Sequence, residues 1–185
     1  MTEPAVSEHD APSRTSRRAL FGAGVLGAAA ALIRSQAADA ATDEIAAMDF
    51  AISLELTARD LYETAIEAGA VGDLWGLLAE QHEAYATRLA GIAGLSADQR
   101  NDEVFDALSG AFRSTTTEAG LELENTAAAT HAGLLSIVAE DDAAAAIASI
   151  SSMESRHATL LATLTGTTDL DTLFLNDATA LSPEG

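Results

Sequence analysis

Three stretches of this chain carry apolar residues at steps of three and four, a fourth carries them on one broader helix face, and a glutamate falls within each series. Such spacing places the residues on the core-facing side of an amphipathic helix. An ionised carboxylate there costs several kcal/mol unless it is paired or bound to a metal ion. Four such carboxylates on four helices therefore predict that they meet. The series are Ile45, Met48, Ile52, Glu55, Arg59, Tyr62 and Ile66; Leu78, Ala79, His82, Glu83, Tyr85, Ala86, Leu89, Ala90 and Ala93; Leu121, Glu124, Ala128, His131, Leu135 and Val138; and Ile147, Ile150, Glu154, His157, Leu161 and Leu164.

The composition favours an all-α fold. The 185 residues suit one domain plus a leader, and 48% of them are apolar, which is enough for a core. Alanine is abundant and aromatic residues make up only 4%, so helix is favoured over sheet. The absence of cysteine excludes disulfides, thiolate ligands and iron–sulfur clusters.

The charge argues against two classes of partner. The net charge is −20, there is no lysine, and residues 41–185 hold 25 acidic residues against five arginines. Nucleic-acid binding needs a basic surface that this chain lacks. Docking on an anionic membrane surface is disfavoured for the same reason. The charge leaves a homo-oligomer open.

Residues 1–40 have the pattern of an export signal. Arg17-Arg18 precede an apolar run over residues 19–33, which is too short for an ordinary membrane span, and residues 38–40 offer a small-x-small cleavage site. The start resembles a twin-arginine translocation signal, although Leu20 precedes Phe21 where the usual order is reversed. A general secretory signal and an uncleaved anchor are the alternatives. Each predicts an exported protein of the periplasm, cell envelope or extracellular space.

The turn signals divide the rest into a bundle over residues 41–166 and a tail over 167–185, which we expect to pack on the outside and then fray. The connections are short, long and short, which is the order of an antiparallel four-helix bundle with one long crossover, as in ferritin-like folds. The predicted helices cover residues 42–68, 73–93, 116–139 and 140–164, with a short helix over 102–112 in the crossover.

Four short segments resemble the exported ferritin-like domain family, which is related to ferritins and rubrerythrins. They are Ala47–Glu55 continued by Leu61-Tyr62, Gln81–Ala84, Leu123–Thr126 and Met153–Ala158, in the family's order and spacing. The resemblance spans roughly residues 44–165. It implies a ferritin-like four-helix bundle and no settled activity, so whether the protein is an enzyme stays open.

The resemblance also implies a set of metal ligands. Residue by residue, it carries over to Glu55, Glu83, Glu124, Glu154 and His157. The chain departs from the family's pattern in two places. The second helix has Ala86 where the motif expects a histidine, and Arg59 stands one turn after Glu55 inside the apolar stripe.

Other polar residues near these stripes carry weaker expectations. His131 lies seven residues after Glu124, about 10 Å along a helix, so a structural role is expected. His82 is about 100° around the helix from Glu83 and would replace the missing ligand only if the helix were rotated. Arg59 would either pair with Glu55 or substitute for the charge of a lost metal. Tyr62 and Tyr85 either pack in the core or donate hydrogen bonds to the carboxylates.

Three hypotheses follow. The first is a site for two iron or manganese ions, bridged by Glu83 and Glu154 and held terminally by Glu55, Glu124 and His157, which handles iron, dioxygen or peroxide. The second is a metal-free bundle with a buried polar network and a structural, stress or binding role in the envelope. The third is an exported helical binding module unrelated to ferritins. No pattern for nucleophilic catalysis or phosphate binding is present.

Overall fold

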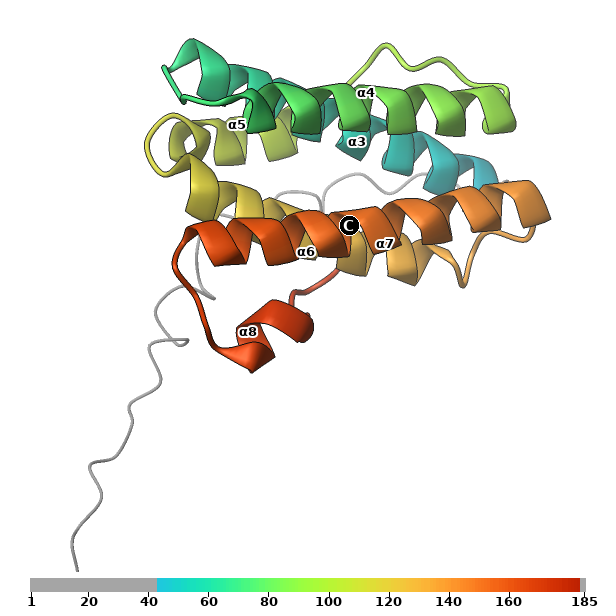
Figure 1. The fold of residues 1–185 in the computed structure, drawn as a ribbon. Helices are drawn as coiled ribbons and strands as arrows, with labels where there is room; N and C mark the ends of the chain where they lie inside the picture. The colour runs from blue at the N-terminus through green and yellow to red at the C-terminus, as the bar shows by residue number, and fades with distance from the viewer. Residues whose placement is uncertain (1–42, 184–185) are drawn as a thin grey trace, which may run out of the picture.

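Helices account for nearly all of the regular structure in residues 43–183, which is the part of the chain that the computed structural model describes (Figure 1). The predicted all-α class is confirmed. The predicted signal segment lies outside the described residues. None of the described helices combines the length and apolar character needed to cross a lipid bilayer. The helices are α3 (Asp43–Glu67), α4 (Asp73–Ala93), α5 (Asp102–Phe112), α6 (Thr116–Leu134), α7 (Asp141–Leu164) and α8 (Leu170–Phe174).

The bundle consists of two helical hairpins, α3–α4 and α6–α7, joined by the crossover that contains α5 (Figure 1). Gly69 and Gly72 have φ of 98° and 111°, so the first tight turn uses backbone conformations that favour glycine. Gly94 ends α4 in the left-handed conformation. Helices α4 and α5 begin and end where the sequence predicts.

Helix α6 is shorter than predicted, because it ends at Leu134 instead of continuing to residue 139. The backbone N–H groups of Ser136 and Ile137 donate to the carbonyls of Gly133 and Leu134, three residues back, so the last turn tightens. The Ser136 hydroxyl also donates to the Gly133 carbonyl at 2.9 Å. A serine that bonds the backbone locally competes with continuation of the helix.

Two apolar clusters occupy the two ends of the bundle. One contains Trp75 and Phe112 with leucines of α3, α4, α5 and α7, and the other contains Ile52 and Leu89 with isoleucines of α7. Each long helix contributes to both clusters and carries its buried polar residues between them. The middle of the bundle is therefore a polar layer sealed by apolar residues at both ends.

The C-terminal tail lies against α6 and α7. The Thr159 hydroxyl donates to the Leu173 carbonyl, and the Asn176 side chain donates to the Asn125 carbonyl. The Leu181 N–H donates to the Thr130 hydroxyl at 2.9 Å, in a buried position. Helix α8 was not predicted from the sequence, and the tail is held as far as Leu181.

Gly120 of α6 leaves room for its neighbours. A Cβ at this position would lie 3.1 Å from both Tyr62 Oη and Leu161 Cδ1. Both neighbours have an exposed fraction of 0%, so neither can move aside easily. A glycine inside a helix costs about 1 kcal/mol relative to alanine, and here it prevents overpacking.

We predict that Gly120→Ala lowers the free energy of unfolding by about 1–2 kcal/mol, because overpacking costs about 1–3 kcal/mol and helix propensity returns at most about 1. Urea denaturation followed by circular dichroism measures the change. Gly76→Ala is the matched control, since a Cβ there meets nothing within 4 Å. The control should be neutral or stabilising, and a Gly120→Ala protein as stable as wild type would contradict this account.

Candidate metal centre

Three carboxylates and three imidazoles meet in the polar layer. Each of the six side chains is at most 6% exposed. Residues seven apart on α6, and three apart on α7, share a helix face, so each of these helices turns two of its side chains inward. The six are Glu55 of α3, His82 of α4, Glu124 and His131 of α6, and Glu154 and His157 of α7.

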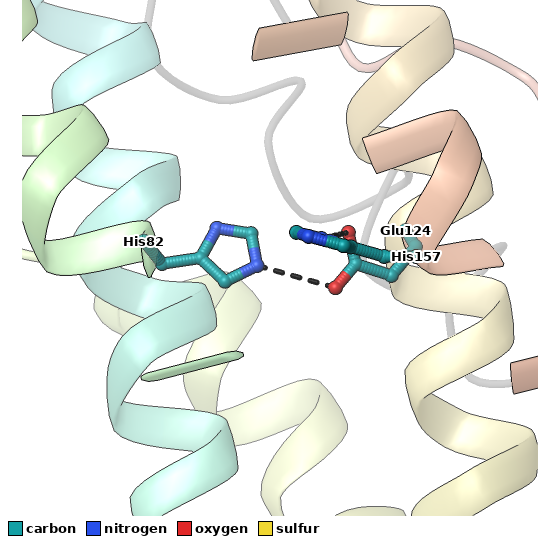
Figure 2. A group of neighbouring side chains, drawn as sticks. All are labelled: His82, Glu124 and His157. Carbon is teal, nitrogen blue, oxygen red and sulfur yellow. Dashed lines mark hydrogen bonds and ion pairs between the residues drawn. The ribbon is translucent and has the colours of Figure 1, made fainter. Parts of the chain in front are cut away.

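His82 stands between two carboxylates. Its Nδ1 lies 2.6 Å from Glu55 Oε2, and its Nε2 lies 3.2 Å from Glu124 Oε1. Figure 2 shows the second contact, with the His82 ring reaching from α4 toward Glu124 on α6. The Tyr62 hydroxyl donates to the same Glu124 oxygen at 2.7 Å. His82 therefore joins the two helical hairpins through charged hydrogen bonds.

The other two imidazoles extend this arrangement in both directions. His131 Nδ1 lies 2.9 Å from Glu154 Oε2, and its Nε2 lies 3.3 Å from Glu55 Oε1. His157 Nδ1 lies 3.2 Å from Glu124 Oε2, a contact drawn in Figure 2, and its Nε2 lies 2.6 Å from Gln81 Oε1. Imidazoles and carboxylates thus alternate along one row of contacting side chains. Starting from Gln81, the row is His157, Glu124, His82, Glu55, His131 and Glu154.

Burial and ion pairing shift the pKa values of the side chains in this row. Burial lowers the pKa of His82, but the Glu124 and Glu55 carboxylates raise it well above its ordinary value. Burial likewise lowers the pKa of His131, and Glu154 more than offsets this, so that the pKa is about 9. Without metal, both imidazoles are therefore protonated at neutral pH.

The pKa values of the carboxylates Glu124 and Glu154 shift in opposite directions. Burial raises the pKa of Glu124, but His82 and His157 lower it to about 2. Burial raises the pKa of Glu154 to about 7, because contact with His131 does not fully offset the loss of water. Glu124 thus holds its charge firmly, whereas Glu154 takes up a proton more readily.

Three buried polar atoms of this layer make no hydrogen bond: Glu55 Oε1 and His131 Nε2, which lie 3.3 Å apart as an ion pair, and Glu154 Oε1. These three residues line a cavity of about 20 Å³, which is otherwise walled mainly by apolar side chains such as Leu54 and Leu181. Such a volume holds about one water molecule. Unpaired buried polar atoms are costly, so this part of the layer has spare capacity to bind a further group.

The donor set fits a transition-metal ion. Two groups of three ligand atoms lie mutually within 4.8 Å: one from His82, Glu124 and His157, the other from Glu55, His82 and Glu154. Carboxylate oxygens mixed with imidazole nitrogens suit iron and manganese, and imidazole also suits zinc. Inward-facing Glu and Glu-x-x-His residues on bundle helices are a known way to build such a site.

The structure brings together four of the five ligands predicted from the resemblance: Glu55, Glu124, Glu154 and His157. It does not bring Glu83 to them. The Glu83 side chain is 52% exposed and forms an ion pair with Arg59. Our expectation of a bridging role for Glu83 differs from the structure, because α4 is rotated so that the adjacent His82 faces inward.

Arg59 also differs from expectation. We considered a guanidinium inserted among the buried carboxylates or paired with Glu55. Instead, Arg59 contacts Glu83 and Asp60 at the surface, and Asp60 accepts a further hydrogen bond from Arg100 at 2.8 Å. Arg59 therefore does not replace a metal in the polar layer.

Two of the six residues, His82 and His131, carry only weak expectations from the sequence. His82 continues the series Trp75, Leu78, Ala86 and Leu89, all of which are buried, and this narrower stripe is the signal that could have identified it. The expected structural role of His131 rested on its separation of about 10 Å from Glu124 along α6. His131 instead contacts Glu154 and Glu55 on other helices, so the separation along its own helix was the wrong measure.

The two tyrosines differ in position. Tyr62 is fully buried and donates to Glu124, as one of the alternatives predicted. Tyr85 is only partly buried, and its ring meets the His82 ring edge to face at 5.8 Å between centroids. Burial raises the pKa of Tyr85 to about 12.

The family described as "Ferritin-like domain" matches residues 43–167. No curated protein and no solved structure matches the chain.

We predict that chelator-treated protein loses stability as pH rises from about 6.5 to about 9. His131 has an ordinary pKa of 6.5 and a pKa of about 9 in the folded protein. The folded state thus holds this proton more tightly than the unfolded state does. The protonated His131 therefore makes its full contribution to the free energy of unfolding below pH 6.5, and this contribution is lost as pH rises through 9. The loss is on the order of 3 kcal/mol. Urea denaturation at a series of pH values measures it.

The control for this prediction is His131→Gln, whose stability should vary less with pH over the same range. Surface carboxylates are already ionised at pH 6.5, and the chain has no lysine or cysteine to titrate. His82, whose pKa is also raised, and Glu154, with a pKa of about 7, titrate in the same direction and remain in the variant, so part of the pH dependence should persist. A wild-type stability that stays level or rises between pH 6.5 and 9 would contradict the protonated state assigned to His131.

Proposed function

The chain belongs to the ferritin-like domain family, and we propose that its buried His–Glu layer binds divalent iron or manganese, up to two ions per chain. The observation that carries this proposal is the pair of buried three-residue ligand groups that share His82. The atoms of Glu55, His131 and Glu154 that make no hydrogen bond support it, because a cation would satisfy the two carboxylate oxygens.

The ligands of the two ions would be the following residues. His82, Glu124 and His157 would hold one ion, and Tyr62 would fix the orientation of Glu124 through its hydrogen bond. A neutral imidazole offers one lone pair, so His82 can serve only one ion at a time, and a second ion would be held by the carboxylates of Glu55 and Glu154. The apolar clusters at both ends would keep bulk water out.

A bound iron or manganese ion would supply redox chemistry toward dioxygen or peroxide, and the proposed role is the handling of iron or of these oxidants. The way in lies beside His157, the most exposed of the six residues, with its side chain 8% exposed. Gln81 covers the outer nitrogen of this ring. We therefore propose that ions enter between α4 and α7.

A second candidate is a metal-free bundle with a structural or binding role. The alternation of imidazoles and carboxylates favours it, because each buried carboxylate already has an imidazole partner. Protonated imidazoles balance buried carboxylates without any ion. The two candidates make opposite predictions for metal content.

We predict that the full-length protein, folded with iron or manganese, carries between one and two ions per chain by elemental analysis. Glu124→Gln should lose at least one of them, because it removes a charged ligand from the group with His82 and His157. Glu83→Gln is the matched control, since it makes the same chemical change on an exposed side chain. The control should keep its metal.

Thermal unfolding completes this test. Under the metal-binding proposal, added metal raises the melting temperature of wild type and Glu83→Gln, but raises that of Glu124→Gln much less. A metal ratio near zero, with a melting temperature that metal does not change, would favour the metal-free candidate. A loss of metal from Glu83→Gln instead would return Glu83 to the site.

We propose separately that residues 1–40 direct export, on the support of the sequence around Arg17-Arg18. In a bacterial host with a twin-arginine pathway, the double substitution Arg17→Lys and Arg18→Lys should retain the protein in the cytoplasm. Fractionation followed by immunoblotting measures this. Unchanged export of the double variant would indicate the general secretory route, and no export of wild type would reject a signal function.

A further inference from the structure

The C-terminal tail closes a pocket against α6 and α7. After α7 the chain turns back, and α8 lies beside α7 (Figure 1). A cavity of about 220 Å³, which we call the tail pocket, lies between the tail and these helices. Its walls are Ser155, Arg156, Ala158 and Thr159 of α7, Asn125 of α6, and residues 172–176. None of the six residues of the His–Glu layer lines it, so the tail pocket is separate from the candidate metal centre.

Hydrogen bonds to the bundle fix the wall of the pocket that the tail supplies. The Thr159 hydroxyl donates to the Leu173 carbonyl at 3.1 Å, and the Asn176 side chain donates to the Asn125 carbonyl at 2.7 Å. Farther along the tail, Leu181 is buried in the core. The tail pocket is therefore enclosed by segments that are anchored on both sides of it, and it is not a gap beside a loose end.

Two apolar side chains of the tail pocket keep most of their surface in water. Phe174 is 74% exposed and Leu175 is 64% exposed, although both line a cavity that lies directly beside them. Helix α8 contains no buried residue at all. Full burial of such a side chain would contribute about 1.5–3 kcal/mol, and the fold leaves this contribution unused at two adjacent residues. A ligand with an apolar part would cover them.

Arg156 gives the tail pocket a positive charge on a protein whose net charge is −20. No acidic residue lines the pocket. Arg59 and Arg100 are each paired with two carboxylates, whereas Arg156 donates only to the Met153 sulfur, at 3.3 Å, among the described residues. A thioether sulfur is a weak acceptor, so the guanidinium is available to a stronger one. The half-buried Asn125 adds a second donor, because its side-chain amide makes no hydrogen bond to a described residue.

We propose that the tail pocket binds a small amphipathic carboxylate, a molecule with one carboxylate group and a short apolar chain. The carboxylate pairs with the Arg156 guanidinium, which can donate two parallel hydrogen bonds to it, and accepts a further one from the Asn125 amide. The apolar chain lies against Phe174 and Leu175. One cationic side chain and one apolar wall match a ligand with one negative charge and one apolar part.

Three probe molecules separate the two halves of this recognition. Hexanoate carries both the charge and the apolar chain, 1-hexanol carries only the chain, and acetate carries only the charge. Each is titrated at neutral pH and constant ionic strength into full-length, chelator-treated protein labelled with nitrogen-15. Backbone amide shifts in nuclear magnetic resonance spectra report both the affinity and the place of binding. Hexanoate should bind several-fold more tightly than either of the others and should shift the amides of residues 155–159 and 172–176.

We predict that Arg156→Gln weakens hexanoate binding about tenfold and leaves 1-hexanol binding unchanged, because it removes a charged hydrogen-bond donor and no apolar contact. Arg88→Gln is the matched control, since Arg88 is an exposed arginine that does not line the tail pocket. The control should bind hexanoate as wild type does. Phe174→Ser should weaken hexanoate and 1-hexanol alike, because both lose the same apolar contact.

Three outcomes would overturn the carboxylate site. In the first, hexanoate shifts no amide around the tail pocket. In the second, 1-hexanol binds as tightly as hexanoate, so that the pocket is merely apolar. In the third, Arg156→Gln and Arg88→Gln weaken hexanoate equally, so that Arg156 contributes only to the general charge. Circular dichroism confirms that each variant is folded. Because the protein is free of metal, the result does not depend on whether the His–Glu layer binds metal.

Discussion

The rest of this structure depends on the placement of three carboxylates in the centre of a helical bundle. Each buried carboxylate loses its water, at a cost of several kcal/mol, and needs a cationic or hydrogen-bonding partner at a fixed distance. Imidazoles supply those partners, and each one reaches from its own helix to others. His82 links α4 to α3 and α6, and His131 links α6 to α3 and α7. The requirement to pair buried charge therefore also fixes how the two hairpins meet.

Protons and metal ions compete for this layer. With no metal, His82 and His131 hold protons because carboxylates surround them. A metal ion binds the deprotonated imidazole, so binding releases protons and strengthens as pH rises. The same geometry thus makes the metal-free protein most stable at lower pH and favours metal at higher pH. A layer of this kind has two alternative ways to balance its charge.

The helices were predictable from the sequence to a greater extent than the layer was. Apolar periodicity with glycine stops located α4 to the residue, because these signals are local, and the short helix predicted over residues 102–112 also matches α5. The ligand set depends on helix rotation, which local signals do not fix. His82 and Glu83 are neighbours, and a broad apolar face on α4 accommodated either one. In the structure His82 lies on the same buried stripe as Leu78 and Leu89, and Glu83 lies outside it, where it pairs with Arg59 on α3, 24 positions away.

The layer of this chain differs in charge from the family's pattern. The pattern has four carboxylates and two imidazoles, with a histidine where Ala86 stands. Glu83 lies at the surface, where it pairs with Arg59, and His82 faces inward, so the layer of this chain has three carboxylates and three imidazoles. Two divalent ions carry four positive charges, which would balance four carboxylates. With only three carboxylates, one positive charge is left unbalanced. One divalent ion together with one protonated imidazole balances three carboxylates without excess. The charge count therefore favours a first ion that binds tightly and a second that binds more weakly, with His131, which contacts both Glu55 and Glu154, as the imidazole that keeps its proton.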